Sequence, residues 1–118
     1  MKKLLLTILL LSQPVFAAHV HPEKYYQSKW CSANHGIQEY VLSDKTRVDC
    51  VTSQYALEVD FASKWAESIG QSLYYSLRTG KQPAVLLILE NPCKDAKYLK
   101  RLNAVSEKYN IKVFTITQ

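Results

Sequence analysis

The sequence is poor in the residues that build zinc sites and disulfide-rich scaffolds. Its 118 residues include three cysteines and three histidines, and no Cys-x-x-Cys spacing occurs, so the usual zinc-binding patterns are absent. The sequence also has no internal repeat and no low-complexity segment. The apolar run from Leu4 to Leu11, broken by Thr7, is too short to cross a bilayer as a stable helix. The length fits one domain with one modest core.

The N-terminus has the pattern of a secretory signal peptide. Lys2 and Lys3 precede the apolar run, and Val15-Phe16-Ala17 places small residues at positions −3 and −1 of a cleavage site. We therefore predict a signal peptide over residues 1–17 and export to the periplasm or the medium, with no stable membrane insertion; an uncleaved anchor is the alternative. Loss of the two lysines lowers the formal net charge from +5 to +3 in residues 18–118. This charge suits a polyanionic partner without requiring one.

Export predicts a disulfide, because thiols become oxidised outside the cytoplasm. Cys50 lies in a predicted strand and is expected to be buried, whereas Cys31 and Cys93 lie near the ends of predicted elements. We therefore expect a Cys31–Cys93 bridge and a buried free thiol at Cys50. A bridge that closes so long a loop stabilises the folded state by roughly 2–4 kcal/mol.

Periodicity and turn residues predict a single α/β domain. Pro22 suits the first turn of a helix, and Gly80 suits the end of another. The continuous apolar run Ala84–Glu90 is typical of a central strand covered on both faces. Succession of strand, helix and strand predicts parallel pairing through right-handed crossovers, so we expect a mixed central sheet flanked by helices in the order α-β-β-β-α-β-α-β. The predicted helices cover residues 23–33, 61–79 and 94–109, and the predicted strands cover 37–42, 47–51, 55–60, 84–90 and 111–116.

Two acidic residues on neighbouring predicted strands form the most informative pair. If Ser53-Gln54 is a two-residue hairpin loop, Thr52 lies opposite Tyr55 and Asp49 lies opposite Glu58. Opposite residues have Cβ atoms about 4.5–5.5 Å apart on the same sheet face. Two carboxylates at that separation require a divalent cation, a basic side chain or a shared proton between them. The pair is therefore a candidate metal site.

The same register puts Arg47 opposite Asp60 and gives the hairpin one charged face. The alternative interpretation is a half-solvated sheet face, on which Arg47 and Asp60 form a surface ion pair worth about 0–1 kcal/mol. The opposite face is expected to be core and consists of Val48, Cys50, Leu57 and Val59.

The helix that follows carries a polar stripe at three- and four-residue spacing. Lys64 lies in its first turn, directly after Asp60, where an ammonium group could approach a metal-bound water or a phosphate oxygen. An ordinary solvated helix face is the alternative. The stripe consists of Lys64, Glu67, Gln71, Tyr75 and Arg78, and the side expected to be buried consists of Ala62, Ile69, Leu73 and Leu77.

Taken together, these motifs resemble the PD-(D/E)XK nuclease superfamily, which has a restriction-endonuclease-like core of order α-β-β-β-α-β. That family carries Asp on its second strand, Glu-x-Lys on its third and often an acid upstream, and Asp49, Glu58-Val59-Asp60 and Glu39 match these positions. Gln71-Ser72-Leu73-Tyr74-Tyr75 matches the Gln-x-x-x-Tyr of the RecB-type branch. The chain departs from the pattern at Asp60, which replaces the lysine, and Lys64 is the natural substitute.

The resemblance implies an exported nuclease that uses Mg²⁺ or Mn²⁺ to hydrolyse phosphodiester bonds, in DNA in preference to RNA, with a homodimer as a possible assembly. The alternatives are a catalytically degenerate member that binds a partner outside the cytoplasm, and a small structural protein. The implied metal ligands are Asp49, Glu58 and Glu39. The implied catalytic residues are Asp49, Glu58, Asp60 and Lys64, and the implied substrate contacts are Gln71, Tyr75 and Arg47.

Overall fold

The computed structural model describes residues 18–118, so the signal peptide predicted for residues 1–17 lies outside the described residues. The elements follow the predicted order, with one additional short 3₁₀ turn. In chain order they are α1 (Glu23–Ala33), β1 (Ile37–Val41), β2 (Arg47–Val51), β3 (Tyr55–Phe61), η1 (Ala62–Lys64), α2 (Trp65–Thr79), β4 (Gln82–Ile88), α3 (Pro92–Tyr109) and β5 (Lys112–Ile116).

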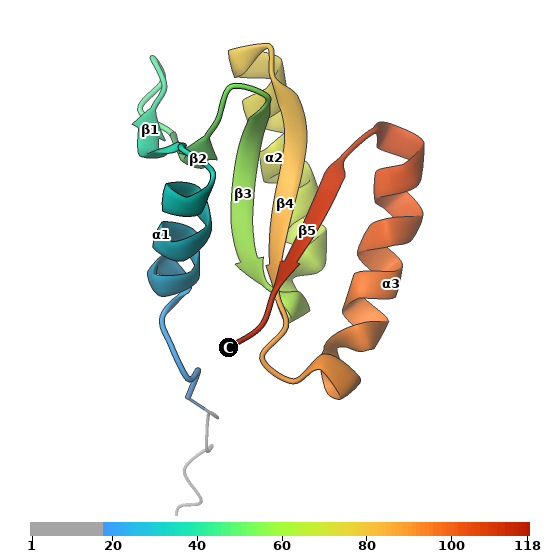
Figure 1. The fold of residues 1–118 in the computed structure, drawn as a ribbon. Coiled ribbons are helices and arrows are strands. Elements are labelled where there is room, and N and C mark those ends of the chain that lie inside the picture. Colours follow the sequence, from blue (N-terminus) through green and yellow to red (C-terminus); the bar gives the residue numbers. More distant parts are fainter. Residues whose placement is uncertain (1–17) are drawn as a thin grey trace, which may run out of the picture.

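The five strands form one mixed sheet in the spatial order β1-β2-β3-β4-β5 (Figure 1). The first three strands pair antiparallel, as expected for consecutive hairpins, and β3, β4 and β5 pair parallel. The parallel pairing predicted for the later strands is confirmed. Since β4 lies between two strands and has helices on both sides, its apolar residues from Pro83 to Ile88 are all buried.

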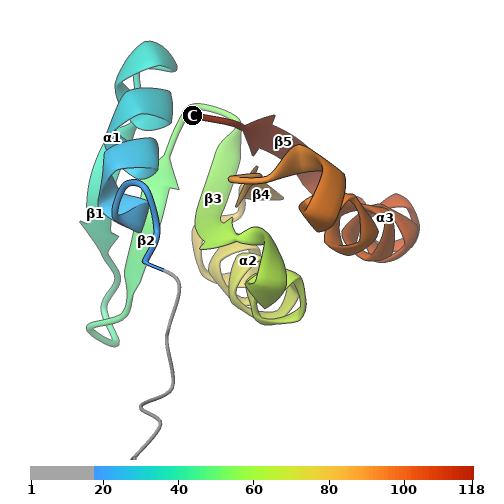
Figure 2. The ribbon, with the colours of Figure 1, turned by 90° about the horizontal axis from the view of Figure 1, so that it is seen from below.

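Helices cover both faces of the sheet, so the protein is a three-layer α/β domain (Figure 2). On one face, Tyr26 and Cys31 of α1 pack on Leu57, Val59 and side chains of β4. The opposite face is covered by α2 and α3, whose cluster is built from Ala62, Val85, Leu87, Leu89, Leu102 and Ile111. Alternate residues of the central strands therefore pack into two separate cores, one on each face of the sheet, as the two-residue period of a strand requires.

The hairpin of β2 and β3 has the predicted turn and register. Cys50 pairs with Leu57 and Val51 pairs with Ala56, and the Thr52 N–H donates to the Tyr55 carbonyl at 2.9 Å. Continued by one residue, this register puts Asp49 opposite Glu58. The regular ladder ends at Cys50, however, so Arg47 has no ladder partner on β3.

The predicted disulfide is wrong: the structure joins Cys31 to Cys50, and Cys93 is exposed and unpaired. The end of α1 lies over β2, which brings the two α carbons to 5.9 Å. Cys93 lies in α3 on the other side of the sheet. Gly36 is required beside the bridge, since a Cβ there would lie 2.3 Å from the Cys50 Sγ. A disulfide is consistent with an exported protein.

The predicted helix over residues 61–79 begins later than expected, and its buried side differs. Phe61 still belongs to β3, and α2 starts at Trp65 after the 3₁₀ turn. Ala62 is buried as expected, but Leu73 and Leu77 are 37% and 80% exposed.

Two serines, Ser68 and Ser72, take the place of the leucines against the sheet, together with Tyr75. Their hydroxyls donate to backbone carbonyls of the preceding turn, at 2.6 Å and 3.0 Å, so no polar group is buried unpaired there. A small side chain at these positions lets the helix backbone approach the strands, which a leucine would prevent.

The three helices are amphipathic or polar. Within residues 18–118, none of them is long and apolar enough to cross a membrane.

Candidate functional site

The structure brings the carboxyl groups of Asp49 and Glu58 close enough for each to act on the pKa of the other. A hydrogen bond between two carboxyl groups needs a proton on one of them, and the environment of Glu58 favours its neutral form. Burial first, and then the charges of Asp49 and Asp60, raise the pKa of Glu58 to about 10. Of the three arrangements that a close carboxylate pair allows, a shared proton is the one that this raised pKa favours.

Asp60 is the third acid of this group and, like Glu58, it is buried and only 6% exposed, whereas Asp49 is part-buried. Burial first, and then the charges of Glu23 and Asp49, raise the pKa of Asp60 to about 7, and the charge of Lys64 opposes this increase. Glu58 Oε2 and Asp60 Oδ2 are buried and have no hydrogen-bond partner among residues 18–118. Buried carboxyl oxygens normally have partners, so these two atoms require an explanation.

Asp49 also holds the two strands together where their ladder ends. Its Oδ2 accepts a hydrogen bond from the Val59 N–H at 2.8 Å, which replaces a ladder bond between β2 and β3. Burial raises the pKa of Asp49, and the bond from Val59 opposes that increase. One oxygen of Asp49 is thus committed to the backbone of β3, which fixes the carboxyl group beside Glu58.

Glu39 lies next to this pair and is held by Gln27. The buried Gln27 side chain donates from Nε2 to Glu39 Oε1 at 3.1 Å and to the Asp49 carbonyl at 3.0 Å. Glu39 has φ 52°, and Lys24 Nζ lies 3.9 Å from its Oε1. A single buried amide therefore links α1, β1 and β2 at the candidate site, and the sequence analysis did not identify it.

Glu23 is a second residue that the sequence analysis missed. It opens α1 and is half-buried, and its pKa is raised by burial first and by the charge of Asp49 next, while Lys64 lowers it. Its charge in turn raises the pKa of Asp60. Acidic residues are common in the first turn of any helix because they complement its dipole, so the sequence position alone carried no functional signal.

Lys64 lies in η1, exposed and near the acids without a close ion pair. Its charge lowers the pKa values of Asp60 and Glu23. Within residues 18–118 the ion pairs closer than 4.0 Å are Lys24–Glu39 and His19–Glu90, so the Lys64 ammonium remains available to a ligand of the acidic group.

The remaining candidates are divided between the site and the surface. Tyr75 is buried, and its pKa is raised to about 12 by burial and then by the charges of Glu58 and Asp49, so it neighbours the acid pair. Gln71 is exposed on α2 and forms no hydrogen bond with any described residue. Arg47 is exposed, and residues 18–118 contain no Arg47–Asp60 ion pair.

In residues 18–118, no group of three or more His, Cys, Asp or Glu side chains is arranged as a ready-made metal centre. Comparison with protein-family models, with curated proteins and with solved structures found no match. Any functional assignment therefore depends on the residues and on their geometry.

Proposed function

We propose that this protein is an exported, metal-dependent nuclease with the restriction-endonuclease-like fold of the PD-(D/E)XK superfamily. The element order, the antiparallel β1-β2-β3 unit and the position of Asp49 and Glu58 on β2 and β3 support this proposal. The observation that carries it is the acid group, in which the buried Glu58 Oε2 and Asp60 Oδ2 have no hydrogen-bond partner in the described part of the chain. Burying several carboxyl groups together destabilises a fold unless a ligand compensates for them.

The donor set fits a hard divalent cation. All of its side-chain donors are carboxyl oxygens, which Mg²⁺ and Mn²⁺ prefer, and two of these oxygens are free of other bonds. Asp49 and Glu58 would hold the ion, with Asp60, Glu39 or Glu23 completing the set. Such an ion, when bound, lowers the pKa of a water and neutralises charge on a scissile phosphate.

The other residues of the site have roles that follow from their positions. The Lys64 ammonium, next to Asp60 and Glu23, would orient the nucleophile or stabilise the negative charge that develops on the phosphate. Gln27 would keep Glu39 and the Asp49 backbone in place. Tyr75 and Gln71 would position the lysine or the nucleic-acid backbone. Export favours foreign or extracellular nucleic acid as the substrate, with DNA preferred to RNA.

One observation favours the alternative, a degenerate member of the fold that binds a partner without cleaving it. The lysine of Glu-x-Lys is replaced by Asp60, and Lys64 forms no ion pair with the acids in the described part of the chain. If the ammonium does not reach the reacting phosphate, the site would bind metal without supporting hydrolysis.

Plasmid cleavage separates these functions. The purified protein, residues 18–118, is incubated with supercoiled plasmid in Mg²⁺, in Mn²⁺ or in EDTA. The variant Asp49→Asn is assayed in parallel, and the control is Glu107→Gln, which changes an exposed acid on α3. We expect nicking that needs metal, is abolished in Asp49→Asn and is unchanged in Glu107→Gln. Calorimetry with Mn²⁺ accompanies the assay. Binding without cleavage would favour the degenerate protein, and absence of both would favour the structural protein.

A further inference from the structure

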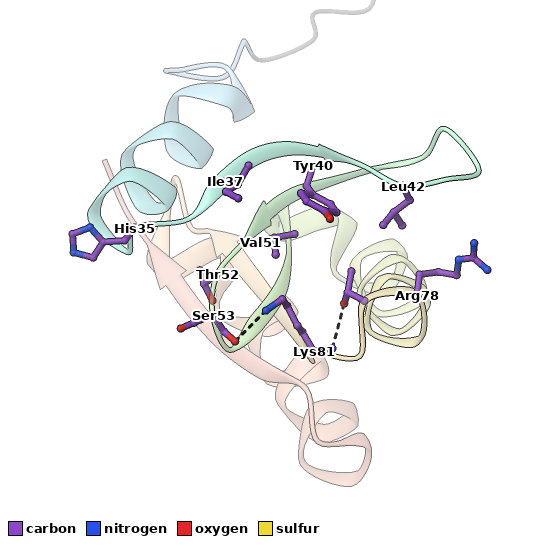
Figure 3. Close-up of a pocket in the computed structure, with 10 residues that line it drawn as sticks. His35, Ile37, Tyr40, Leu42, Val51, Thr52, Ser53, Arg78 and Lys81 are labelled. Carbon is purple, nitrogen blue, oxygen red and sulfur yellow. Dashed lines mark hydrogen bonds between the residues drawn. The ribbon is translucent and has the colours of Figure 1, made fainter.

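A groove of about 470 Å³ lies between the β1–β2 hairpin and the end of α2, outside the acid group (Figure 3). Its hairpin side is apolar and presents Ile37, Tyr40 and Val51, and Arg78 and Lys81 lie across from them. No acidic residue lines it. An apolar wall that faces two cations suits a ligand with a flat apolar part and a negative charge.

The groove depends on an irregularity in β1. Ile37 and Tyr40 are three residues apart, so a regular strand would direct them to opposite faces. Glu39, between them, has φ 52°, a left-handed conformation that interrupts the alternation, and both side chains line the groove. As a result Ile37 is 60% exposed and Tyr40 is 41% exposed, which leaves an aromatic ring open to solvent on an edge strand.

Tyr75 connects the groove to the acid group. Leu42 and Val51, which line the groove, pack in one cluster with Tyr75, and the charges of Glu58 and Asp49 act on the Tyr75 hydroxyl. Along β2, Asp49 and Val51 are two residues apart, roughly 7 Å. The groove and the acid group are therefore neighbours along β2, with the buried Tyr75 packed between them.

The groove carries an uncompensated positive charge. Lys81 Nζ donates to the Ser53 carbonyl at 3.1 Å and Arg78 Nη2 donates to Ser43 Oγ at 2.9 Å, and both acceptors are neutral. Neither cation has an ion pair within residues 18–118. Asp44 lies near Arg78, whose charge contributes to lowering the pKa of that carboxyl, so part of the Arg78 charge is compensated.

We propose that this groove binds a nucleotide of a single-stranded segment next to the scissile phosphate, with its base on Tyr40 and its phosphate at Lys81 and Arg78. The proposal rests on the proposed nuclease function, because the acid group supplies the neighbouring phosphate. A single strand is required, since a base must be free of its duplex neighbours to stack on an aromatic side chain.

The test measures the anisotropy of a fluorescein-labelled oligo(dT) in EDTA, where binding needs no metal. Loss of one stacked base corresponds to about 1–3 kcal/mol, so Tyr40→Leu should raise Kd by between about fivefold and about a hundredfold, whereas Tyr40→Phe should not. Lys81→Ala should reduce the slope of log Kd against log salt by about 0.7, as expected for one phosphate contact to a single strand. Tyr109→Leu and Lys100→Ala are the matched controls on α3, where both side chains are exposed.

Each outcome separates the groove from the nuclease. An unchanged Kd in Tyr40→Leu and an unchanged salt slope in Lys81→Ala would refute nucleotide binding in the groove. Metal-dependent plasmid cleavage by the same variants would still support the proposed nuclease activity. Oligonucleotide binding that depends on Tyr40, without any plasmid cleavage, would support nucleotide binding in the groove and refute the nuclease activity. If a polyglutamate peptide displaces the oligonucleotide more strongly than unlabelled oligo(dT) does, the groove serves an acidic peptide and the proposal is wrong.

Discussion

Glu58→Gln should stabilise the protein at neutral pH in the absence of metal. Glu58 is 6% exposed, and its pKa is raised from an ordinary 4.5 to about 10 by burial and by the neighbouring carboxylates. In the folded state the group is therefore neutral at pH 7, whereas in the unfolded chain it is ionised. Glutamine is neutral in both states, and its N–H is able to donate to a neighbouring carboxylate such as Asp49, as a protonated carboxyl is.

The magnitude follows from the difference in protonation. Holding a carboxyl with an ordinary pKa of 4.5 in its protonated form costs about 1.4 kcal/mol for each pH unit above that value, or about 3 kcal/mol at pH 7. Since the folded state binds more protons than the unfolded state, the free energy of unfolding of the wild type falls as pH rises through the window from about 4.5 to about 10. Glu58→Gln removes this contribution, so we expect it to be more stable by about 2–3 kcal/mol at pH 7 and equally stable near pH 4.5.

The measurement is guanidinium denaturation in EDTA, followed by the fluorescence of Trp30 and Trp65, from about pH 5 to about pH 8. Excess Mn²⁺ should raise the wild-type stability, because a ligand that binds only the folded state stabilises it, and should have less effect on Glu58→Gln. Glu107→Gln is the control. Equal pH slopes for wild type and Glu58→Gln, or a less stable variant at pH 7, would refute the reasoning from the buried acid group.

Three further predictions concern the disulfide, the buried amide and the lysine. The double variant Cys31→Ala/Cys50→Ala should lower the free energy of unfolding by about 3 kcal/mol, the value expected for a disulfide that closes a loop of this length. Cys93→Ala should leave the free energy of unfolding unchanged, and both variants are measured by guanidinium denaturation. Gln27→Leu removes the amide donor from Glu39 Oε1 and from the Asp49 carbonyl, both part-buried, so it should cost about 1–3 kcal/mol of stability and weaken Mn²⁺ binding in calorimetry about tenfold or more. Unchanged affinity would show that the amide is only structural. Lys64→Ala should reduce metal-dependent plasmid nicking at least about a hundredfold with Mn²⁺ affinity retained, and full activity would remove this lysine from the mechanism.

Local sequence signals were sufficient for the order of elements and for the hairpin. The loop at Ser53-Gln54 and the two-residue period set the register of β2 and β3, and with it the meeting of Asp49 and Glu58. The apolar run of β4 indicated a strand covered on both faces, and Gly80 ends α2 with φ 71°. These features are set by turn chemistry and by patterns within a few residues, which a sequence displays directly.

Contacts between distant segments were outside the reach of such patterns. The disulfide partner of Cys31 depends on how α1 lies over β2, and periodicity does not reveal that Ser68 and Ser72, instead of Leu73 and Leu77, face the sheet.

The residues of the candidate site likewise include some that the sequence determined and others that only the tertiary structure brought together. The sequence by itself determined the pair of acids across two neighbouring strands, since a hairpin register is a local property. The tertiary structure alone added Glu23 and Gln27 from α1, placed Tyr75 beside the pair and left Arg47 and Gln71 at the surface. The physical reason is that burial and the charges of neighbours change the pKa of a carboxyl group, and both depend on which helix covers which face of the sheet.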